Sequence, residues 1–399
     1  MRLFPRIYET ALRQHIDNDS QMLFVTGPRQ VGKSTLCKTV ADTVFNWDIQ
    51  KNKRLILKGS DAVAGEAGLN IMQEKLPVVA LDEIHKFARW KSFLKGFFDE
   101  YRDAARIVVT GSSRLDVYKK GGDSLMGRYF LYHVHPFSVA EMVNPSRKDK
   151  IIHPPVPIQE KDWKALWEHG GFPEPLAKRD KKFTLRWNKT RKNQLFREDL
   201  RDLTRIQEIG QIEVMAEILE TRSGDSLKYS TLANEVRVSE NTIRKWIATL
   251  NSLYFGFTIK PWHKNVKNAL TKEPKWYKRD WSQISDTGKK AETFVACHLL
   301  KAVEWWNDCG YGEFDLYYIR NKQKQEVDFL VTQNKSPWFL AEVKLADKNI
   351  SPVLSLMQEQ TGAKHAFQIV VEMDYVNSDC FKKTKPTVVP AKTFLSQLV

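Results

Sequence analysis

Over the first 145 residues, short apolar runs alternate with amphipathic stretches, and this alternation predicts strands followed by helices. Apolar runs occupy residues 21–26, 77–84 and 106–110, and a helical pattern follows the first of them at 35–41. Runs that are apolar throughout are typical of strands buried on both faces of a parallel sheet. The pattern predicts an α/β domain over residues 1–145.

Helical periodicity replaces this pattern in the middle of the chain. Residues 160–222 repeat with a helical period, and one apolar stripe comprises Ile212, Met215, Ile218 and Leu219. Prolines crowd the stretch 151–157, which predicts a linker. We interpret residues 146–225 as a linker followed by a helical region.

Two further helices, at 229–236 and 238–250, are separated by a short turn. Ser230 and Ser239 are their predicted N-caps. The second helix has an apolar face made of Ile243, Trp246, Ile247 and Leu250, and a polar outer face made of Glu240, Asn241, Thr242, Arg244 and Lys245. With residues 254–259 as a wing strand, the pattern predicts a winged helix-turn-helix over 226–262. DNA binding and protein binding both remain open for such a module.

Period-two patterns dominate the end of the chain, after an amphipathic helix at 288–300. Three strands are predicted at 314–319, 326–332 and 337–345. Alternation places Glu342 and Lys344 on one face of the last strand. A hairpin turned at 334–337 would bring Asp328 near Glu342. We expect a second α/β domain over 285–399, preceded by a basic linker over 263–284.

Charge is concentrated in two stretches of this 399-residue chain, which carries 63 Lys+Arg and 48 Asp+Glu, a net charge of +15. Residues 178–205 contain eleven Lys/Arg and four Asp/Glu, and residues 255–290 contain nine and three. The aromatic residues within these stretches include Trp187, Trp262, Trp276, Tyr277 and Trp281. Basic residues interleaved with rings suit contact with a nucleic acid, through phosphate attraction and base stacking. A solvated basic surface, or a seam against an acidic domain, is the alternative.

The broad class of the protein follows from what the composition lacks. No apolar stretch reaches the roughly 18 residues that span a bilayer, and the start of the chain has no signal-peptide apolar region. The four cysteines, Cys37, Cys297, Cys309 and Cys380, form no CxxC pair. We expect a cytoplasmic, multidomain protein without zinc fingers and without a membrane partner.

A phosphate-binding loop is predicted between the first strand and its helix. Residues 27–34 read Gly-Pro-Arg-Gln-Val-Gly-Lys-Ser, which is GxxxxGK[ST] in its strand–loop–helix setting. Lys33 would reach the β- and γ-phosphates of ATP, and the Ser34 hydroxyl would bind Mg²⁺. The residues predicted to contact the nucleotide here are Gly27, Arg29, Gln30, Val31, Gly32, Lys33, Ser34 and Thr35.

Two later strands supply the rest of the predicted nucleotide site. Asp82 and Glu83 end the apolar run 77–84. Asp82 would hold Mg²⁺ through its water shell, and Glu83 would orient the attacking water, which favours hydrolysis over a passive switch. Ser112, at the end of the next strand, is our choice for a residue that senses the γ-phosphate.

A short element after the third strand adds a family resemblance. Gly127-Arg128 is followed by His135-Pro-Phe-Ser138. Here the chain resembles AAA-type ATPases of bacteria and archaea in which the ATPase module precedes a C-terminal domain of unknown function. The resemblance implies that Arg128 is an arginine finger or sensor, and a surface arginine paired with an aspartate is the alternative.

The C-terminal carboxylates suggest a second kind of chemistry. Two converging carboxylates bind Mg²⁺ or Mn²⁺, and a nearby lysine can activate water. Asp328, separated by thirteen residues from the Glu342-x-Lys344 motif, together with a helical Glu292, resembles the restriction-endonuclease-like PD-(D/E)xK superfamily. The resemblance implies that Asp328 and Glu342 are metal ligands, Lys344 the catalytic lysine and Glu292 an auxiliary ligand. Val327 stands where a proline is often found.

These observations predict an ATPase that engages nucleic acid, with DNA as the favoured partner. Whether the C-terminal domain also cuts the nucleic acid stays open. The rival hypothesis is a regulatory switch whose nuclease-like fold is inactive and binds protein or DNA. A homo-oligomer in which Arg128 completes a neighbour's site is a third arrangement.

Overall fold

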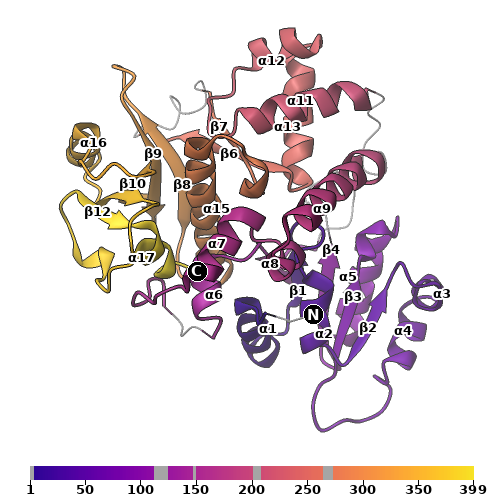
Figure 1. The fold of residues 1–399 in the computed structure, drawn as a ribbon. Helices are drawn as coiled ribbons and strands as arrows, with labels where there is room; N and C mark the ends of the chain where they lie inside the picture. Colours follow the sequence, from indigo (N-terminus) through magenta and orange to yellow (C-terminus); the bar gives the residue numbers. More distant parts are fainter. Residues whose placement is uncertain (1–3, 112–124, 147–149, 201–207, 264–272) are drawn as a thin grey trace. The chain divides into compact units, whose positions relative to one another are not determined.

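The computed structural model describes residues 4–111, 125–146, 150–200, 208–263 and 273–399. The chain forms two compact units, one ending at His135 and one running from Pro136 to Val399 (Figure 1). The first compact unit thus ends ten residues before the predicted domain boundary at residue 145, because residues 136–143 pack with the second unit. Each unit is described by itself.

The first unit contains a five-stranded sheet in the order β2-β3-β4-β1-β5. Every neighbouring pair is parallel, which confirms the predicted sheet type. The strands are β1 (Met22–Thr26), β2 (Thr43–Asn46), β3 (Val78–Asp82), β4 (Arg106–Gly111) and β5 (Tyr129–His133). Since all five run the same way, their carboxyl ends meet at one edge of the sheet, the edge at which ligands bind in open α/β folds.

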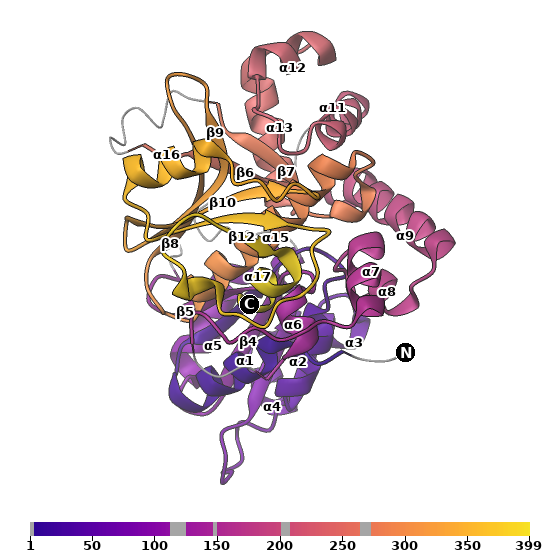
Figure 2. The same ribbon diagram turned by 60° about the vertical axis from the view of Figure 1, so that its left-hand side comes forward.

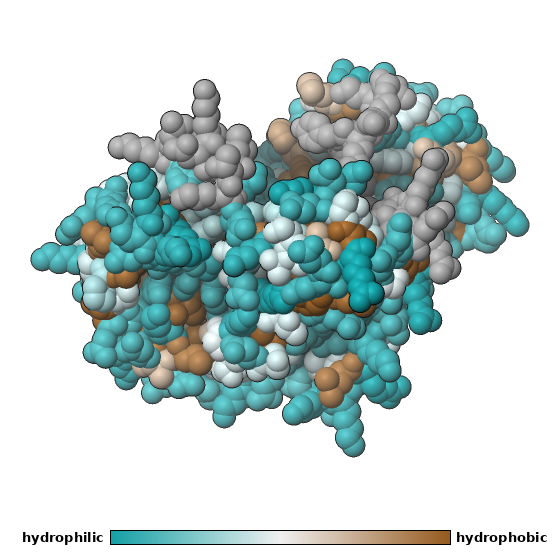
Figure 3. Space-filling view, turned by 90° about the horizontal axis from the view of Figure 1, so that it is seen from above, coloured by the Kyte–Doolittle hydropathy of each residue, from teal (hydrophilic) through white to brown (hydrophobic). Residues whose placement is uncertain are grey.

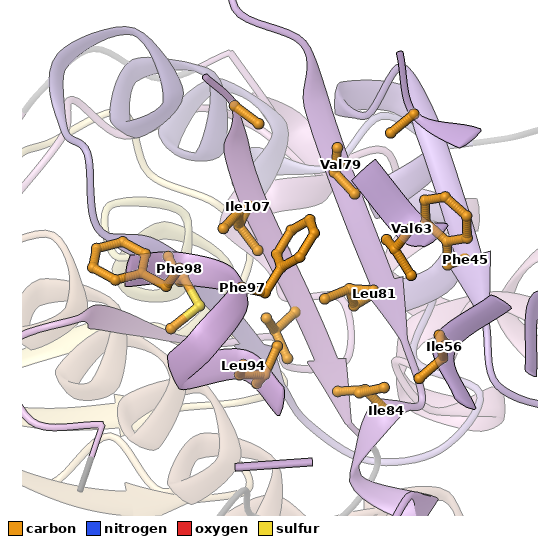
Figure 4. Close-up of a cluster of buried hydrophobic side chains, with 14 of the residues drawn as sticks. Phe45, Ile56, Val63, Val79, Leu81, Ile84, Leu94, Phe97, Phe98 and Ile107 are labelled. Carbon is orange, nitrogen blue, oxygen red and sulfur yellow. The ribbon is translucent and has the colours of Figure 1, made fainter. Parts of the chain in front are cut away.

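Helices cover this sheet and bury its apolar residues. They are α1 (Ile7–Asn18), α2 (Lys33–Val40), α3 (Gln50–Lys58), α4 (Ser60–Glu66), the short η1 (Ile84–Lys86) and α5 (Trp90–Tyr101). Figure 4 shows alternate strand residues such as Val79, Leu81 and Ile107 facing Phe97 and Phe98 of α5. Because side chains alternate between the two faces of a sheet, the face that carries Val79, Leu81 and Ile107 packs against α3, α4 and α5. Helices α1 and α2 also contact the sheet, through β1, β3 and β4.

The second unit contains a mixed seven-stranded sheet in the order β12-β11-β10-β9-β8-β6-β7. Its strands are β6 (Gly256–Pro261), β7 (Lys275–Lys278), β8 (Phe314–Arg320), β9 (Glu326–Gln333), β10 (Ser336–Lys344), β11 (His365–Val370) and β12 (Thr387–Pro390). The sheet lies between the long helix α15 (Thr287–Asp308) and α16 (Pro352–Thr361) in both views (Figures 1 and 2).

The remaining helices of this unit precede or cap the sheet. They are α6 (Val139–Val143), α7 (Glu160–His169), α8 (Pro173–Lys178), α9 (Lys181–Gln194), the π-helical turn η2 (Leu195–Asp199), α11 (Ile209–Thr221), α12 (Tyr229–Val236), α13 (Glu240–Ser252), the short η3 (Trp281–Gln283) and η4 (Cys380–Lys382), and α17 (Ala391–Ser396). The Pro-rich stretch is not a free linker, because His153 N–H donates to the Gln397 carbonyl (3.0 Å) and Val156 N–H donates to Ser396 Oγ (3.1 Å).

The predicted helix pair is present as α12 and α13. Ser239 caps α13, since its Oγ accepts from Thr242 N–H at 3.1 Å, and the predicted apolar face of α13 is buried. Ser230 is not a cap, because α12 already begins at Tyr229 after an extended Lys228. The strands that follow, β6 and β7, pair antiparallel.

The predicted basic linker over 263–284 is wrong at its C-terminal half, because β7 and η3 lie there. Trp276, Tyr277 and Trp281 are almost completely buried, so these rings are unavailable for stacking on bases. The cations between them are buried too: Lys278 pairs with Glu220 of α11. The charges of Lys275, Lys278 and Arg279 therefore lie in the interior of the unit.

No helix within the described ranges is long and apolar enough to cross a membrane. On the face drawn in Figure 3, hydrophilic residues predominate and the hydrophobic patches are small and scattered.

A buried polar seam joins α6 to α15. His298 Nδ1 donates to the Phe294 carbonyl (2.7 Å), so that Nε2 is left to accept from Val139 N–H (3.1 Å). One turn further on, Lys301 pairs with Glu141 at 2.5 Å, and both side chains are buried. Burial lowers the pKa of His298 to about 3, which keeps the ring neutral.

We predict that this histidine makes stability depend on acid. Because the folded pKa lies below the usual value of about 6.5, the unfolded chain binds a proton that the folded chain does not between pH 6.5 and 3. As the pH is lowered through this window, the free energy of unfolding should fall by up to about 1.4 kcal/mol for each pH unit. Urea unfolding of His298→Gln between pH 7 and pH 5 should show a shallower fall than the parent; identical slopes would show that His298 contributes nothing.

Candidate nucleotide site and carboxylate cluster

The loop between β1 and α2 has a backbone that requires glycine at two positions. Gly27 has φ +149°, and a Cβ there would lie 2.3 Å from the Val134 carbonyl oxygen. Gly32 has φ +99° and directly precedes α2. The predicted loop thus forms between a strand and a helix, with its amides at the N-terminus of α2, where anions are favoured.

Lys33 lies within this loop. Its Nζ is buried and donates to the carbonyls of Gly27 (3.0 Å) and Pro28 (2.8 Å). Burial lowers the pKa of Lys33 to about 8, and the charges of Glu83 and Asp82 oppose that shift. The ammonium is therefore inside the loop that was predicted to hold phosphates.

Asp82 connects the loop to the other strands. Its carboxylate is almost fully buried; Oδ1 accepts from Ser34 Oγ at 3.1 Å, and Oδ2 accepts from Asn46 Nδ2 at 2.6 Å. Thr110 Oγ1 also donates to Oδ1. A hydroxyl and a carboxylate in contact are hard oxygen ligands of the kind that Mg²⁺ prefers, so the residues present fit that ion.

Thr110 and Asn46 are site residues that the sequence analysis missed. Thr110 belongs to β4, which lies between β1 and β3, so that its side chain reaches Asp82 while its Oγ1 accepts from Glu83 N–H at 3.2 Å. Ser112, the residue predicted for this strand end, lies outside the described residues. Asn46 and Thr110 are both polar residues near the end of an apolar strand, and this pattern could have indicated them as site residues.

Glu83 follows directly and has a left-handed backbone, with φ 57°. Its carboxylate lies 3.5 Å from Lys86 Nζ and 3.8 Å from His85 Nε2. The predicted water-orienting carboxylate is thus at the same sheet edge as Lys33, and it influences the pKa of that lysine.

The other predicted loop residues have varied surroundings. Val31 is buried, Arg29 is partly buried, and Gln30 and Thr35 are exposed. An additional residue, Arg6, holds the loop: its Nη1 donates to the Val31 carbonyl at 2.7 Å and its Nη2 to the His135 carbonyl at 2.5 Å. Nothing in the sequence pattern pointed to Arg6.

Arg128 lies away from this loop. It precedes β5, so it is at the amino edge of the sheet, opposite the edge formed by the carboxyl ends. There it forms a two-point ion pair with Asp99 of α5, at 2.8 and 3.0 Å. The alternative of a surface arginine paired with an aspartate matches this placement, and a sensor role within the same chain does not. A finger that acts on a neighbouring copy stays a prediction.

The C-terminal residues predicted to act together are close to one another. Asn334 and Lys335, both with positive φ, form a two-residue turn between β9 and β10. Across this hairpin, Asp328 Oδ2 of β9 accepts from Val343 N–H of β10 at 2.8 Å. Within β10, Lys344 Nζ donates to Glu342 Oε1 at 2.8 Å. The expected approach of Asp328 to Glu342 therefore occurs.

Glu292 of α15 lies near the same cluster, where its Oε1 accepts from Tyr277 Oη at 2.7 Å. Burial, and then the charges of Glu292 and Glu342, raise the pKa of Asp328 well above its ordinary value. Asp328 and Glu292 line an open cavity of about 440 Å³, together with a further carboxylate, Glu326, and a lysine, Lys275.

The metal site that the sequence analysis predicts here stays a prediction. In the part of the chain that the structure describes, no group of three or more histidine, cysteine, aspartate or glutamate side chains is arranged to hold a metal ion. Lys275 instead lies among the carboxylates, 3.0 Å from Glu292 and 2.7 Å from Glu326.

Comparison with known proteins divides the chain into three matched segments. Residues 19–143 match the family model of an AAA domain, residues 160–285 match a domain of unknown function (DUF8612), and residues 287–394 match another (DUF4143). No curated protein sequence matches the chain. Together with the loop and the parallel sheet, the first match defines the class: the chain carries a P-loop AAA ATPase domain. The two segments that follow have no assigned activity.

Two solved structures show weak similarity. PCH-2 of C. elegans has a TM-score of 0.25 and 16% identity, over 40% of this chain and 42% of that chain. AMPPCP-bound DnaA from Aquifex aeolicus has a TM-score of 0.30 and 12% identity, over 62% of this chain and 87% of that chain. This chain thus covers less than half of PCH-2. At these values neither likeness bears on what this chain binds.

We predict that Thr110 supports catalysis through Asp82. Thr110→Val keeps the shape of the side chain and removes the hydroxyl that bonds to Asp82. Loss of such a supporting hydrogen bond should lower the rate of Mg²⁺-dependent ATP hydrolysis about tenfold or more, with little change in affinity for Mg²⁺-free ATP. Thr39→Val, on the exposed side of α2, is the matched control. Equal rates for the two variants would refute the role of Thr110.

Proposed function

We propose that the first unit binds Mg²⁺-ATP at residues 27–34 and hydrolyses it. The observation that carries this proposal is the contact between Ser34 Oγ and Asp82 Oδ1, at 3.1 Å, beside the buried ammonium of Lys33. It joins the two motifs, far apart in sequence, whose residue types suit phosphate and Mg²⁺. The AAA-domain match over 19–143 agrees with it.

Each residue has a role that follows from its place. The loop amides and Lys33 bind the phosphates, and Ser34 with Asp82 would hold Mg²⁺, which neutralises charge on the phosphates when bound. Thr110 and Asn46 fix the orientation of the Asp82 carboxylate. Glu83 orients the water that attacks the γ-phosphate, and its own amide is fixed by Thr110.

We expect Lys33→Ala to reduce ATP hydrolysis by about a hundredfold or more, because it removes a buried cation from the phosphate loop. Lys38→Ala, an exposed lysine of the same helix, should retain the parent activity. Phosphate release measured with purified protein tests both. Substantial hydrolysis by Lys33→Ala, in a preparation free of other ATPases, would contradict the proposed site.

We further propose that the second unit engages nucleic acid through α9. Lys182, Arg186 and Lys189 follow one another at helical spacing and are all exposed, whereas Trp187 and Asn188 on the other side are buried. None of the three cations has a carboxylate partner within 4 Å among the described residues. A row of uncompensated cations on one helix face complements the phosphates of a nucleic acid.

The α13 face gives weaker support to this proposal. Asn241, Arg244 and Lys245 are exposed, as the winged-helix prediction requires. Arg244, however, stacks over the ring of Tyr229 at 3.8 Å and lies 3.9 Å from Glu240. The winged-helix prediction stays open, and α9 is the better candidate for binding phosphates.

Replacing Lys182, Arg186 and Lys189 together by alanine should weaken DNA binding. The plot of log affinity against log salt should become shallower by about 0.9 for each phosphate that the variant no longer neutralises. Alanine at Lys348, Lys364 and Lys385, exposed lysines elsewhere in the unit, serves as the control. Fluorescence anisotropy with a labelled duplex measures both slopes. Equal slopes in the two triple variants would remove α9 from the interface.

Cleavage of that nucleic acid is the competing function. The bond from the Val343 amide to Asp328, next to the Glu342–Lys344 pair, supports it. The position of Lys275 among the carboxylates favours the rival hypothesis, a platform that binds without cutting.

A further inference from the structure

Lys275 has an unusual environment for a lysine. It belongs to β7, and its side chain is 5% exposed. Its Nζ lies 2.7 Å from Glu326 Oε1, 3.0 Å from Glu292 Oε1 and 3.9 Å from Asp328 Oδ1. These carboxylates come from α15 and β9, so one ammonium links three elements of the unit.

The carboxylates around Lys275 already have other partners: Asp328 Oδ2 accepts from the Val343 amide, and Glu292 Oε1 accepts from Tyr277 Oη. Glu342 is not among the ion pairs of Lys275; its Oε1 accepts from Lys344 Nζ, and its buried Oε2 has no hydrogen-bond partner among the described residues. A divalent ion such as Mg²⁺ needs near-octahedral oxygen ligands at about 2.0–2.1 Å, several of them usually water. Here the oxygen atoms converge on a nitrogen instead, and they do so at hydrogen-bond and ion-pair distances.

Electrostatics also favours a cation supplied by the protein. Several carboxylates close together and largely buried repel one another unless a positive charge lies between them. Lys275 provides that charge permanently, from a strand that is itself part of the sheet. Burying a second, divalent cation beside an ammonium that is almost completely buried would add strong repulsion.

We propose that Lys275 is the resident cation of this cluster and that the wild-type cluster takes no divalent metal ion. The metal implied by the nuclease resemblance therefore does not fit, and the cluster of Glu292, Glu326 and Asp328 is an ion-pair core that joins β7 to α15 and β9. An ion-pair core without a metal ion agrees with the proposed platform that binds nucleic acid without cutting it. The role of Lys275 does not depend on ATP hydrolysis.

The wild-type chain and Lys275→Met give the decisive comparison. Mn²⁺ binding is measured by isothermal titration in the absence of nucleotide, together with the melting temperature. We expect Lys275→Met to bind one more Mn²⁺ than the wild type, to melt lower without metal, and to be restabilised by Mn²⁺. Lys324→Met, a lysine lining the same cavity, should behave as the wild type. Equal Mn²⁺ stoichiometry for wild type and a folded Lys275→Met would overturn the proposal.

A second pair of variants keeps the test decisive if Lys275→Met does not fold. Asp328→Asn should leave the Mn²⁺ stoichiometry of the wild type unchanged, and loss of one Mn²⁺ site in it would overturn the proposal. Lys275→Met combined with Glu292→Gln and Glu326→Gln removes the repulsion along with the cation. This triple variant should fold without metal. If it does not fold, and if Asp328→Asn loses a Mn²⁺ site, the cluster is a metal centre and the proposal is wrong. ATP hydrolysis and DNA binding, measured on the same proteins, report the proposed function separately.

Discussion

The buried carboxylate of Asp82 is the constraint on which the nucleotide site depends. A charge removed from water must be matched by hydrogen bonds, and here the donors come from three different elements. Ser34 lies in the first turn of α2, Asn46 ends β2, and Thr110 lies in β4. Satisfying this one group therefore fixes the loop relative to two other strands before any ligand is present.

Motif spacing was sufficient to predict the parts of the site that are local in sequence. The loop over 27–34 and the position of Asp82 at the end of its strand are as expected, because each depends on neighbouring residues. The parallel sheet is as expected because its strands are apolar throughout. Thr110 could not be assigned in the same way, since its role follows from the strand order that inserts β4 between β1 and β3. Arg6 reaches the loop from the start of the chain, and no pattern marks such an interaction.

Charge and aromatic content were the least reliable basis for predicting which residues face a nucleic acid. The stretch 255–290 has the composition of a nucleic-acid surface, yet Lys275, Lys278 and Trp276 are buried in ion pairs or in the core. Composition cannot distinguish a cation that faces water from one that faces a carboxylate on a distant helix. The periodicity of α9 gives better information, because Lys182, Arg186 and Lys189 share the exposed face opposite Trp187.

The central claim is that Ser34 and Asp82 act as one unit on Mg²⁺-ATP, and a double-mutant cycle tests it most directly. Rates of Mg²⁺-dependent hydrolysis are measured for Ser34→Ala, Asp82→Asn and the double variant. Residues that serve one ion lose their effect together, so the double variant should be little slower than the slower single variant. Losses that simply multiply, with all three proteins folded, would show that the two residues act independently and would contradict the account.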